Sequence, residues 1–599
     1  MAQTHTFHIP VMGIGFTIDS PLKVSKFGID SVISLVDDIL IEKMRVMYCK
    51  KFKIPYEEIT EKMEDFRAKR ITSYLNLIKT LSEKEFEEFK KTTTRTINDI
   101  NIFFDTLPDA SSLKREFKQL TKSHFSFNEI KNWFKENLSM GGIDVNIMTK
   151  VDKDNYIEGE KLPTEYNDAH AALRGFAMSD VDSSLVLSAG MNPRLYSYLS
   201  QFKDFYPDKN GFIKKKVILK VSDYRSAMIQ GKFLAKKGIW VSEYRIESGL
   251  NCGGHAFATE GYLLGPVLEE FKVKREELRQ SLQELLFQTF LNADNVVPKT
   301  DLNFKISAQG GVGTAEEHQF LLEYYQVDSV GWGSPFLLVP EATTVDDATL
   351  KKLVEAKEED VYLSDISPLG VPFNNLKGNT KDLEKMRLIE KGRPGSACPK
   401  KFVALNKEFT EKGICTASRQ YQYLKIKALD KEDILESEYQ KRYNEIIEKT
   451  CTCVGLGTTA LLANNLDTKT EGEGVSICPG PNIAYFSKAM GLKEIINAIY
   501  GKSSKITSAE RPNMFVKELN IYIDFLKKKL DEMVLVSTPK QIKYVKAFAN
   551  NLKEGLQYYN QLFGQVRNKA ESDLSSILQD LSKSEQRLQR LNLEIVKLG

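Results

Sequence analysis

Three glycine-rich turns in the middle of the chain are the segments best suited to chemistry. Residues 251–255 read Asn-Cys-Gly-Gly-His, residues 309–314 read Gln-Gly-Gly-Val-Gly-Thr, and residues 331–334 read Gly-Trp-Gly-Ser. Glycines placed just after a buried strand let backbone N–H groups approach an anion, because no Cβ keeps the anion away. The turns therefore predict a bound phosphate. The histidine beside the first turn, His255, indicates proton-transfer chemistry next to that phosphate.

The elements that precede these turns must bring them together. Eight segments are apolar or rich in β-branched residues, and helical patterns separate several of them. We expect strands at residues 8–17, 30–36, 143–148, 184–188, 215–221, 239–246, 304–308 and 329–332. Eight strands alternating with helices predict an α/β fold of the (β/α)8 TIM-barrel class, with a doubly wound open sheet as the alternative. The barrel is favoured because the turns follow strands six, seven and eight, and barrels hold phosphates in the loops after their last two strands.

The rest of the chain divides by composition. Residues 1–36 and 141–380 form the expected barrel, whose usual size is about 250 residues. Residues 37–140 are charged and helical in period, which predicts a helical insertion after the second strand with helices at 57–81 and 83–100. Residues 381–505 form a mixed region that contains most of the cysteines, and residues 506–599 predict long helices, including 512–533 and 539–566.

The last helical segment carries an apolar stripe. The stripe repeats every seven residues, as a coiled coil or an antiparallel helical hairpin does. It consists of Leu574, Leu581, Leu588 and Ile595, with Ile577, Leu591 and Leu598 at the companion positions. Such a stripe packs either on its own domain or on a second copy of the chain, so a homo-oligomer through these helices is one of two outcomes.

Composition excludes some partners. The 599 residues include 84 basic and 81 acidic side chains, a formal charge of only +3, which gives no electrostatic reason to expect nucleic acid or an acidic membrane. We see no apolar run of about 18 residues and no secretory leader pattern. Seven cysteines, an odd number in a long chain, fit a reducing compartment better than a disulfide framework. We therefore expect a cytoplasmic protein.

At these residues the chain resembles the nitronate monooxygenase family, also called 2-nitropropane dioxygenases, and the related flavin-type enoyl-ACP reductases. The resemblance covers roughly residues 9–379 without the helical insertion. Residues 10–13 match the family's opening Pro-Met/Gly strand, residues 20–21 match its Ser/Thr-Pro turn, and residues 145–147 match its Val-Asn-Leu strand. Three turns of the family, Glu-Ala-Gly-Gly-His, Ala-Gly-Gly-Ile and Met-Gly-Thr-Phe, resemble residues 251–255, 308–312 and 332–336. The segment 365–372 resembles the one that follows the family's barrel and lies over the cofactor mouth.

The resemblance implies an FMN cofactor. It places the phosphate against the backbone of Gly310, Gly311, Gly313, Gly333 and Ser334. It brings Asn146 and Lys220 toward the ring or ribityl part, where Lys220 supplies a cation for a ring that becomes negative on reduction. The matched motifs add Met12, Gly13, Gly253 and Gly254 to the cofactor-binding residues. A residue that closes a strand is the plain alternative for Lys220, and a turn or cap is the plain alternative for Asn146.

His255 is the predicted catalytic residue. An imidazole with a pKa near 6.5 accepts a proton at neutral pH, and removing an acidic C–H next to a nitro or carbonyl group gives a carbanion that a flavin can oxidise. The resembled family uses its Gly-Gly-His histidine in this way. Asn251 and Cys252 depart from the family's glutamate and alanine, which puts the substrate in doubt more than the flavin. Cys252 is a redox-active thiol or, more plainly, a small buried residue.

Five cysteines gather within 81 positions of the mixed region. They are Cys398, Cys415, Cys451, Cys453 and Cys478. An iron–sulfur cluster needs about four thiolates and a zinc site a similar number of soft ligands, so a metal centre is one interpretation and buried structural thiols are the other.

These observations predict an FMN-dependent oxidoreductase in which His255 takes a proton from a nitroalkane-like carbon acid. One alternative is an enoyl-thioester reductase that uses NAD(P)H to reduce the flavin. The other is a barrel scaffold that binds partners without catalysis.

Overall fold

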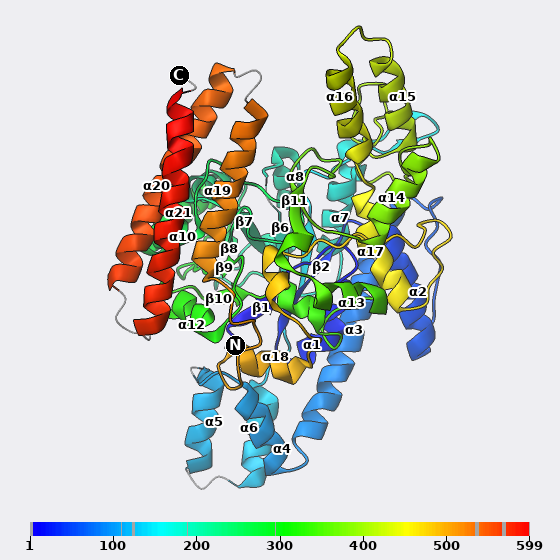
Figure 1. The fold of residues 1–599 in the computed structure, drawn as a ribbon. Helices are drawn as coiled ribbons and strands as arrows, with labels where there is room; N and C mark the ends of the chain where they lie inside the picture. The colour runs from blue at the N-terminus through cyan, green and yellow to red at the C-terminus, as the bar shows by residue number, and fades with distance from the viewer. Residues whose placement is uncertain are drawn as a thin grey trace.

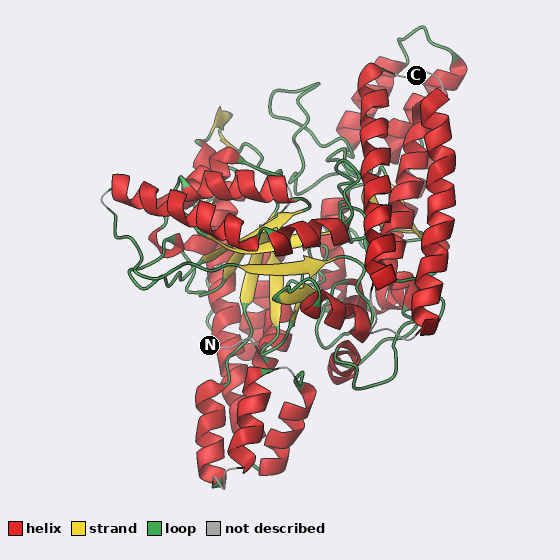
Figure 2. Cartoon of the chain, turned by 90° about the vertical axis from the view of Figure 1, so that its left-hand side faces the viewer, coloured by secondary structure: helices red, strands yellow, loops and turns green. Residues whose placement is uncertain are grey.

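The barrel predicted from the sequence is present and closed. The computed structural model describes residues 4–109, 111–122, 126–188, 190–293, 295–533, 538–565 and 571–597. Within them eight parallel strands pair in a ring, in the order β1 (Phe7–Ile9), β10 (Ser329–Gly331), β9 (Lys305–Gln309), β8 (Val241–Glu247), β7 (Lys216–Val221), β6 (Ser184–Leu187), β3 (Ile143–Ile147) and β2 (Asp30–Ser34). His8 pairs with Gly331 on one side and with Asp30 on the other, which closes the ring. The fold class is therefore confirmed, and Figure 2 shows the strands at the centre with helices around them.

The first strand is shorter than the sequence predicted. It ends at Ile9, whereas we expected residues 8–17 to be extended. Pro10 has no N–H to give to a neighbouring strand, and Gly13 takes a positive φ of 55°, which turns the chain. Residues 10–19 consequently form a turn at the mouth of the barrel instead of more strand.

Helices connect the strands and cover the outside of the ring. They are α1 (Ser20–Val24), α2 (Asp38–Phe52), α3 (Phe66–Thr93), α7 (Asp168–Ala177), α8 (Pro193–Tyr198), α9 (Tyr224–Ala235), α10 (Leu264–Val273), α11 (Arg275–Asn292), α12 (Ala315–Glu323) and α13 (Asp347–Glu355). Side-chain caps fix where several begin: Asp37 accepts from Leu40 N at α2, Asp223 from Ser226 N at α9, and Thr314 from Glu317 N at α12. Such caps place helix starts directly after strand ends, where a barrel has its loops.

The region after β2 has two parts. α2 and α3 pack against the barrel, and α3 is one helix of 28 residues where the sequence suggested a break near Ser82. Ser82 is buried inside this helix. α4 (Ile97–Thr106), α5 (Ser112–Lys122) and α6 (Phe127–Asn137) project from the barrel in Figure 1 and have a core of their own, with Phe104 stacked on Phe117 at 4.0 Å.

Two small antiparallel ribbons were not foreseen. They are β4 (Tyr156–Ile157) with β5 (Glu160–Lys161), and β11 (Val361–Ser364) with β12 (Phe373–Leu376). The second ribbon follows the barrel and begins the chain's course across its mouth.

The chain after β12 forms helices on two sides of the barrel. α14 (Thr380–Glu390), α15 (Arg419–Leu429), α16 (Glu436–Glu448), α17 (Thr452–Ala463) and α18 (Leu492–Ile499) belong to the mixed region. α17 is almost wholly buried, and Lys400 joins this region to the end of β2 through an ion pair with Asp37, Nζ to Oδ2 at 2.6 Å. Residues 436–463, across α16 and α17, are long and apolar enough for a membrane span, but 67% of their most apolar window is buried in the protein. The core helix of a globular protein has the same composition.

The last three helices form a bundle beside the barrel (Figure 1). They are α19 (Met514–Met533), α20 (Pro539–Gln565) and α21 (Glu571–Lys597). The heptad residues Leu581, Leu588 and Ile595 of α21 are buried in the core that it shares with α19 and α20. The stripe is thus covered by the chain's own helices. Leu598 and Val566, named in the sequence prediction, lie outside the described residues.

Candidate functional site

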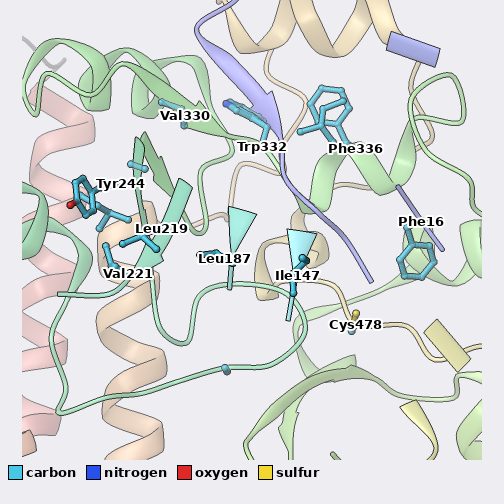
Figure 3. Packing of buried hydrophobic residues seen from close by; sticks show 14 of the residues in the cluster. Phe16, Ile147, Leu187, Leu219, Val221, Tyr244, Val330, Trp332, Phe336 and Cys478 are labelled. Atoms are coloured by element: carbon cyan, nitrogen blue, oxygen red, sulfur yellow. The ribbon is translucent and has the colours of Figure 1, made fainter. Parts of the chain in front are cut away.

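A cavity of about 400 Å³ lies at the carboxyl ends of the barrel strands. This is the end at which TIM-barrel enzymes carry their active sites. Its floor includes the strand ends at Asn146, Lys220 and Glu247. Ile147 and Leu187, the last residues of β3 and β6, pair with each other and belong to the hydrophobic core around the strands (Figure 3). All three glycine turns and His255 line the same cavity.

The turn after β9 shows why glycine is needed there. Gly310 and Gly311 have φ values of 128° and 79°, and a Cβ on Gly311 would lie 2.0 Å from Asn251 Nδ2. In the part of the chain that the structure describes, the backbone N–H groups of Gly311 and Val312 have no hydrogen-bond partner. The turn therefore brings free backbone donors to the cavity wall, which is the arrangement that binds anions.

Gly313, which the resemblance assigned to the phosphate, lies differently. Its N–H donates to Glu317 Oε2 at 3.0 Å, and a Cβ on it would lie 2.7 Å from Arg511 Nε. The glycine makes room for the arginine and is not among the residues that line the cavity. The sequence could not show this, because Arg511 is about 200 residues away.

The other two turns are joined by a loop from the mixed region. Gly254 N donates to Cys478 O at 3.1 Å, and Gly480 N donates to Ser334 Oγ at 2.9 Å. A Cβ on Gly253 would lie 2.8 Å from the same Cys478 carbonyl, so this glycine lets the loop approach. A Cβ on Gly333 would lie 3.5 Å from Pro10 and 3.9 Å from Met12, and Gly13 lines the same cavity.

His255 lies on the cavity wall with a defined orientation. Its Nε2 is 2.7 Å from Ser367 Oγ, and its ring packs edge-on against Phe373 at 5.0 Å. Burial, with a smaller contribution from the nearby Lys150 cation, lowers the pKa of His255 to about 4. The imidazole is therefore neutral at pH 7, which differs from the value near 6.5 that we assumed from the sequence.

The floor of the cavity carries a charged pair. Lys220 Nζ lies 2.8 Å from Glu247 Oε2, and Glu247 Oε1 accepts from Gln309 Nε2 at 2.6 Å. Lys220 is thus a cation neutralised by a carboxylate, and Glu247 was missed in the sequence although it ends strand six. Asn146 donates through Nδ2 to Val186 O at 3.3 Å. Asn251 Oδ1 is buried with no hydrogen-bond partner among the described residues.

The apolar part of the wall comes from outside the barrel. It is formed by Leu369, Val371, Phe373, Val403, Leu405 and Leu456. Leu369 and Val371 belong to the segment 365–372, which the resemblance placed over the cofactor mouth. Val403, Leu405 and Leu456 lie up to more than a hundred positions after the last strand, and no local signal in the sequence assigns them to the site.

The cysteines of the mixed region separate into two groups. The thiols of Cys415, Cys398, Cys451 and Cys453 contact one another in that order, and these contacts raise the pKa of Cys398 and Cys453 while lowering that of Cys451. Cys478 belongs to the cavity wall, and burial raises its pKa to about 12. Over the described ranges, no three His, Cys, Asp or Glu side chains form a group that could hold a metal ion.

Cys252 is buried beneath the first turn. Its Sγ lies 3.8 Å from Gly249 O, and burial strongly raises its pKa. A thiol that stays protonated is a poor nucleophile, so the geometry favours the packing role over the redox role.

Comparisons with known proteins give structural likeness only. No protein-family model and no curated protein matches the chain. It is similar to FabK from Thermotoga maritima, at 13% identity over 64% of this chain and 82% of that one, with a TM-score of 0.31. It is also similar to the enoyl reductase domain of MlnA from the macrolactin biosynthesis cluster of Bacillus amyloliquefaciens, at 15% identity over 71% of this chain and 89% of that one, with a TM-score of 0.31. With scores this low, the barrel rests on the chain's own strand pairing.

Proposed function

We propose that the chain is an FMN-dependent oxidoreductase in which His255 takes a proton from a carbon acid and the flavin accepts the electrons. The observation that carries the proposal is that three glycine turns, far apart in sequence, line one cavity of about 400 Å³ together with His255. Ligand sites are commonly cavities of about 300–1,000 Å³ with a few polar groups on an apolar wall.

The residues present fit a flavin phosphate. The free N–H groups of Gly311 and Val312 belong to residues that line the cavity beside Gly333 and Ser334, because the two turns follow the neighbouring strands β9 and β10. The turn residues Gly311, Val312, Gly333 and Ser334 would hold the phosphate end, while Asn146 and the Lys220–Glu247 pair would lie beside the remainder of the cofactor. Asn251 Oδ1, which is buried without a partner among the described residues, is an acceptor and would suit an N–H or O–H of the cofactor and not its phosphate.

His255 would act as the base. With its Nε2–H donating to Ser367 Oγ, the lone pair on Nδ1 is left to accept a proton from the substrate. The contact with Ser367 and the edge-on packing against Phe373 hold the plane of the ring. When bound, FMN supplies the acceptor for two electrons.

The lowered pKa of His255 restricts the substrate. Each unit by which a base is weakened costs about 1.4 kcal/mol in proton transfer, so a base with a pKa of about 4 suits only carbon acids whose anions are well stabilised. Nitroalkanes, whose anions are the resonance-stabilised nitronates, meet this requirement better than simple ketones do. This supports the nitronate-type reaction.

An NAD(P)H-dependent reduction of an enoyl thioester is the second candidate. The apolar wall from residues 369–456 favours it, because such a wall would hold an acyl chain. The neutral state of His255 weighs against it, since a proton donor must be protonated at working pH. A scaffold without catalysis is the third alternative.

The test is the visible spectrum of the purified protein, followed by anaerobic titration with a nitroalkane and, separately, with NADH and NADPH. We expect the bands of oxidised flavin and their loss on adding the nitroalkane. Bleaching by a pyridine nucleotide alone would favour the enoyl reductase. Protein that neither contains nor takes up flavin would refute both reactions and leave the scaffold.

A further inference from the structure

We propose that Arg511 is a positioning residue for the phosphate end of the flavin. It lies beyond the barrel, in the segment that leads into α19, and it holds the turn after β9 from the side away from the cavity. The proposal rests on the proposed function, because it assigns a second layer to the same cofactor site.

The arginine is buried and fully engaged. Its side chain is 5% exposed and forms an ion pair with Glu317 at 2.8 Å. Its Nη2 donates to Gly311 O at 2.5 Å and its Nε donates to Asn482 Oδ1 at 2.7 Å. The planar fork of a guanidinium makes such divergent contacts with fixed geometry, which a lysine cannot reproduce.

These contacts orient the turn. A trans peptide unit points its C=O and the next N–H in opposite directions. Because Gly311 C=O is directed to Arg511, which does not line the cavity, Val312 N–H is directed away from Arg511. Asn482 adds a second restraint by donating through Nδ2 to Val312 O at 2.8 Å. The donor set of the turn is therefore held in place before a ligand binds, which lowers the cost of binding.

Glu317 connects the turn with the C-terminal helices. Its Oε2 accepts from Gly313 N at 3.0 Å, and its Oε1 accepts from Met514 N at 2.8 Å, at the first residue of α19. The pair carries no net charge toward the cavity. Arg511 thus acts through geometry, and the expected effect is on ligands that reach the turn.

The experiment compares FMN with riboflavin, which lacks the phosphate. Apoprotein of the full chain is titrated with each ligand by flavin fluorescence, for the wild type and for Arg511→Lys. We expect the wild type to prefer FMN, and the variant to lose at least tenfold in affinity for FMN while its affinity for riboflavin changes less than twofold. A structural defect of general kind would weaken both ligands alike.

Arg67→Lys is the matched control. Arg67 is also buried and also donates to a loop carbonyl after a strand, Nη2 to Val36 O at 2.7 Å, but it lies away from the glycine turns. Its FMN-to-riboflavin ratio should equal that of the wild type. If Arg511→Lys does not fold, Asn482→Ala removes one restraint and should shift the ratio in the same direction.

The outcomes separate the two proposals. A wild type that binds neither flavin refutes the proposed function. A wild type that prefers FMN, together with an unchanged ratio in both Arg511→Lys and Asn482→Ala, refutes the role of Arg511 alone. Restoration of the ratio in Arg511→Ala by added guanidinium would support it further.

Discussion

The two ends of the barrel differ in how their polar groups are satisfied. The hollow at the amino ends of the strands is the larger, about 880 Å³ against about 400 Å³ at the mouth. Its charges serve one another: Arg245 pairs with Glu243 at 2.8 Å, Ser307 donates to Glu243, and Ser183 donates to Asp144 at 2.7 Å. Each hollow has a buried side-chain atom without a hydrogen-bond partner among the described residues, His8 Nε2 at the amino ends and Asn251 Oδ1 at the mouth, but the mouth also has glycine turns with unused backbone N–H groups. The unused backbone donors of the glycine turns, and not the volume of the cavity, distinguish the ligand site at the mouth from the hollow at the amino ends.

Removing the base should have the largest effect. His255→Ala is expected to slow flavin reduction by the carbon acid by about 10²- to 10⁴-fold, the usual contribution of a general base, while bound flavin is retained. The measurement is anaerobic stopped-flow absorbance on flavin-loaded protein. His170→Gln is the control, since His170 is buried outside the cavity against Asp152. Equal rates in the wild type and in His255→Ala would refute the assignment.

The pH profile of the same reaction sharpens the assignment. The neutral imidazole is the active form, and its pKa is lowered to about 4. The second-order rate constant for flavin reduction, which reports on the enzyme before the carbon acid binds, should therefore stay constant as pH falls through 6.5. It should decline only as pH approaches 4. A decline in this rate constant centred at pH 6.5 would show that the base has the pKa of a solvent-exposed histidine.

Breaking the Arg245–Glu243 ion pair at the amino ends of the strands should lower the stability of the fold without affecting the cofactor site. Arg245→Met leaves the buried Glu243 carboxylate without its partner, which costs about 3–5 kcal/mol in the free energy of unfolding. Urea unfolding measures this loss, and the affinity for FMN of the folded fraction should stay within twofold. Arg245→Met combined with Glu243→Gln should recover part of the stability. A large loss of flavin affinity in the single variant would contradict the division between the two ends.

A side chain on the turn after β9 should weaken the cofactor. Gly311→Ala places a Cβ 2.0 Å from Asn251 Nδ2 at a φ of 79°, a strain of about 1–3 kcal/mol, which corresponds to roughly 5- to 150-fold in FMN affinity. Gly159→Ala is the matched control, because Gly159 has a φ of 93° and nothing within 4 Å of its Cβ position. Equal FMN affinities in the two variants would refute the assignment of this turn to the cofactor phosphate.

Sequence patterns were sufficient for the barrel but only for part of the site. Strand-and-helix periodicity is local, so all eight strands were found, and the one large error, the length of the first strand, came from overlooking Pro10 and Gly13. The glycine turns were found because positive φ selects glycine. Arg511 and the loop at Cys478 were missed because their contacts with the turns join segments more than a hundred residues apart. Ser367 lies in the segment 365–372 that was expected over the cofactor mouth, but its contact with His255 was not predicted. The same distance hid the reason for Gly313, which accommodates an arginine.

The smallest expected effect concerns the contact between the mouth of the barrel and the C-terminal helix α19. Glu518 of α19 accepts from Ser248 Oγ and from Leu264 N at 2.9 Å, and burial raises its pKa to about 7. Between an ordinary value of about 4.5 and 7, the folded state keeps a proton that the unfolded state has released. Its contribution to stability is therefore complete below about 4.5 and is lost as pH rises through 7.

Glu518→Gln should abolish that loss, because an amide does not titrate. Between pH 6 and pH 7 the wild type should lose about 1 kcal/mol in the free energy of unfolding that the variant keeps. The neighbouring Tyr522 and Tyr559 stay protonated because burial raises their pKa, so they add no slope in this range. Asp144, at the amino ends of the strands, provides the comparison because its pKa is raised to about 6. Asp144→Asn should change the pH dependence of the free energy of unfolding mainly below pH 6. If Glu518→Gln and the wild type have the same slope between pH 6 and pH 7, the carboxyl is ionised in the folded protein and this contact is not sensitive to pH near neutrality.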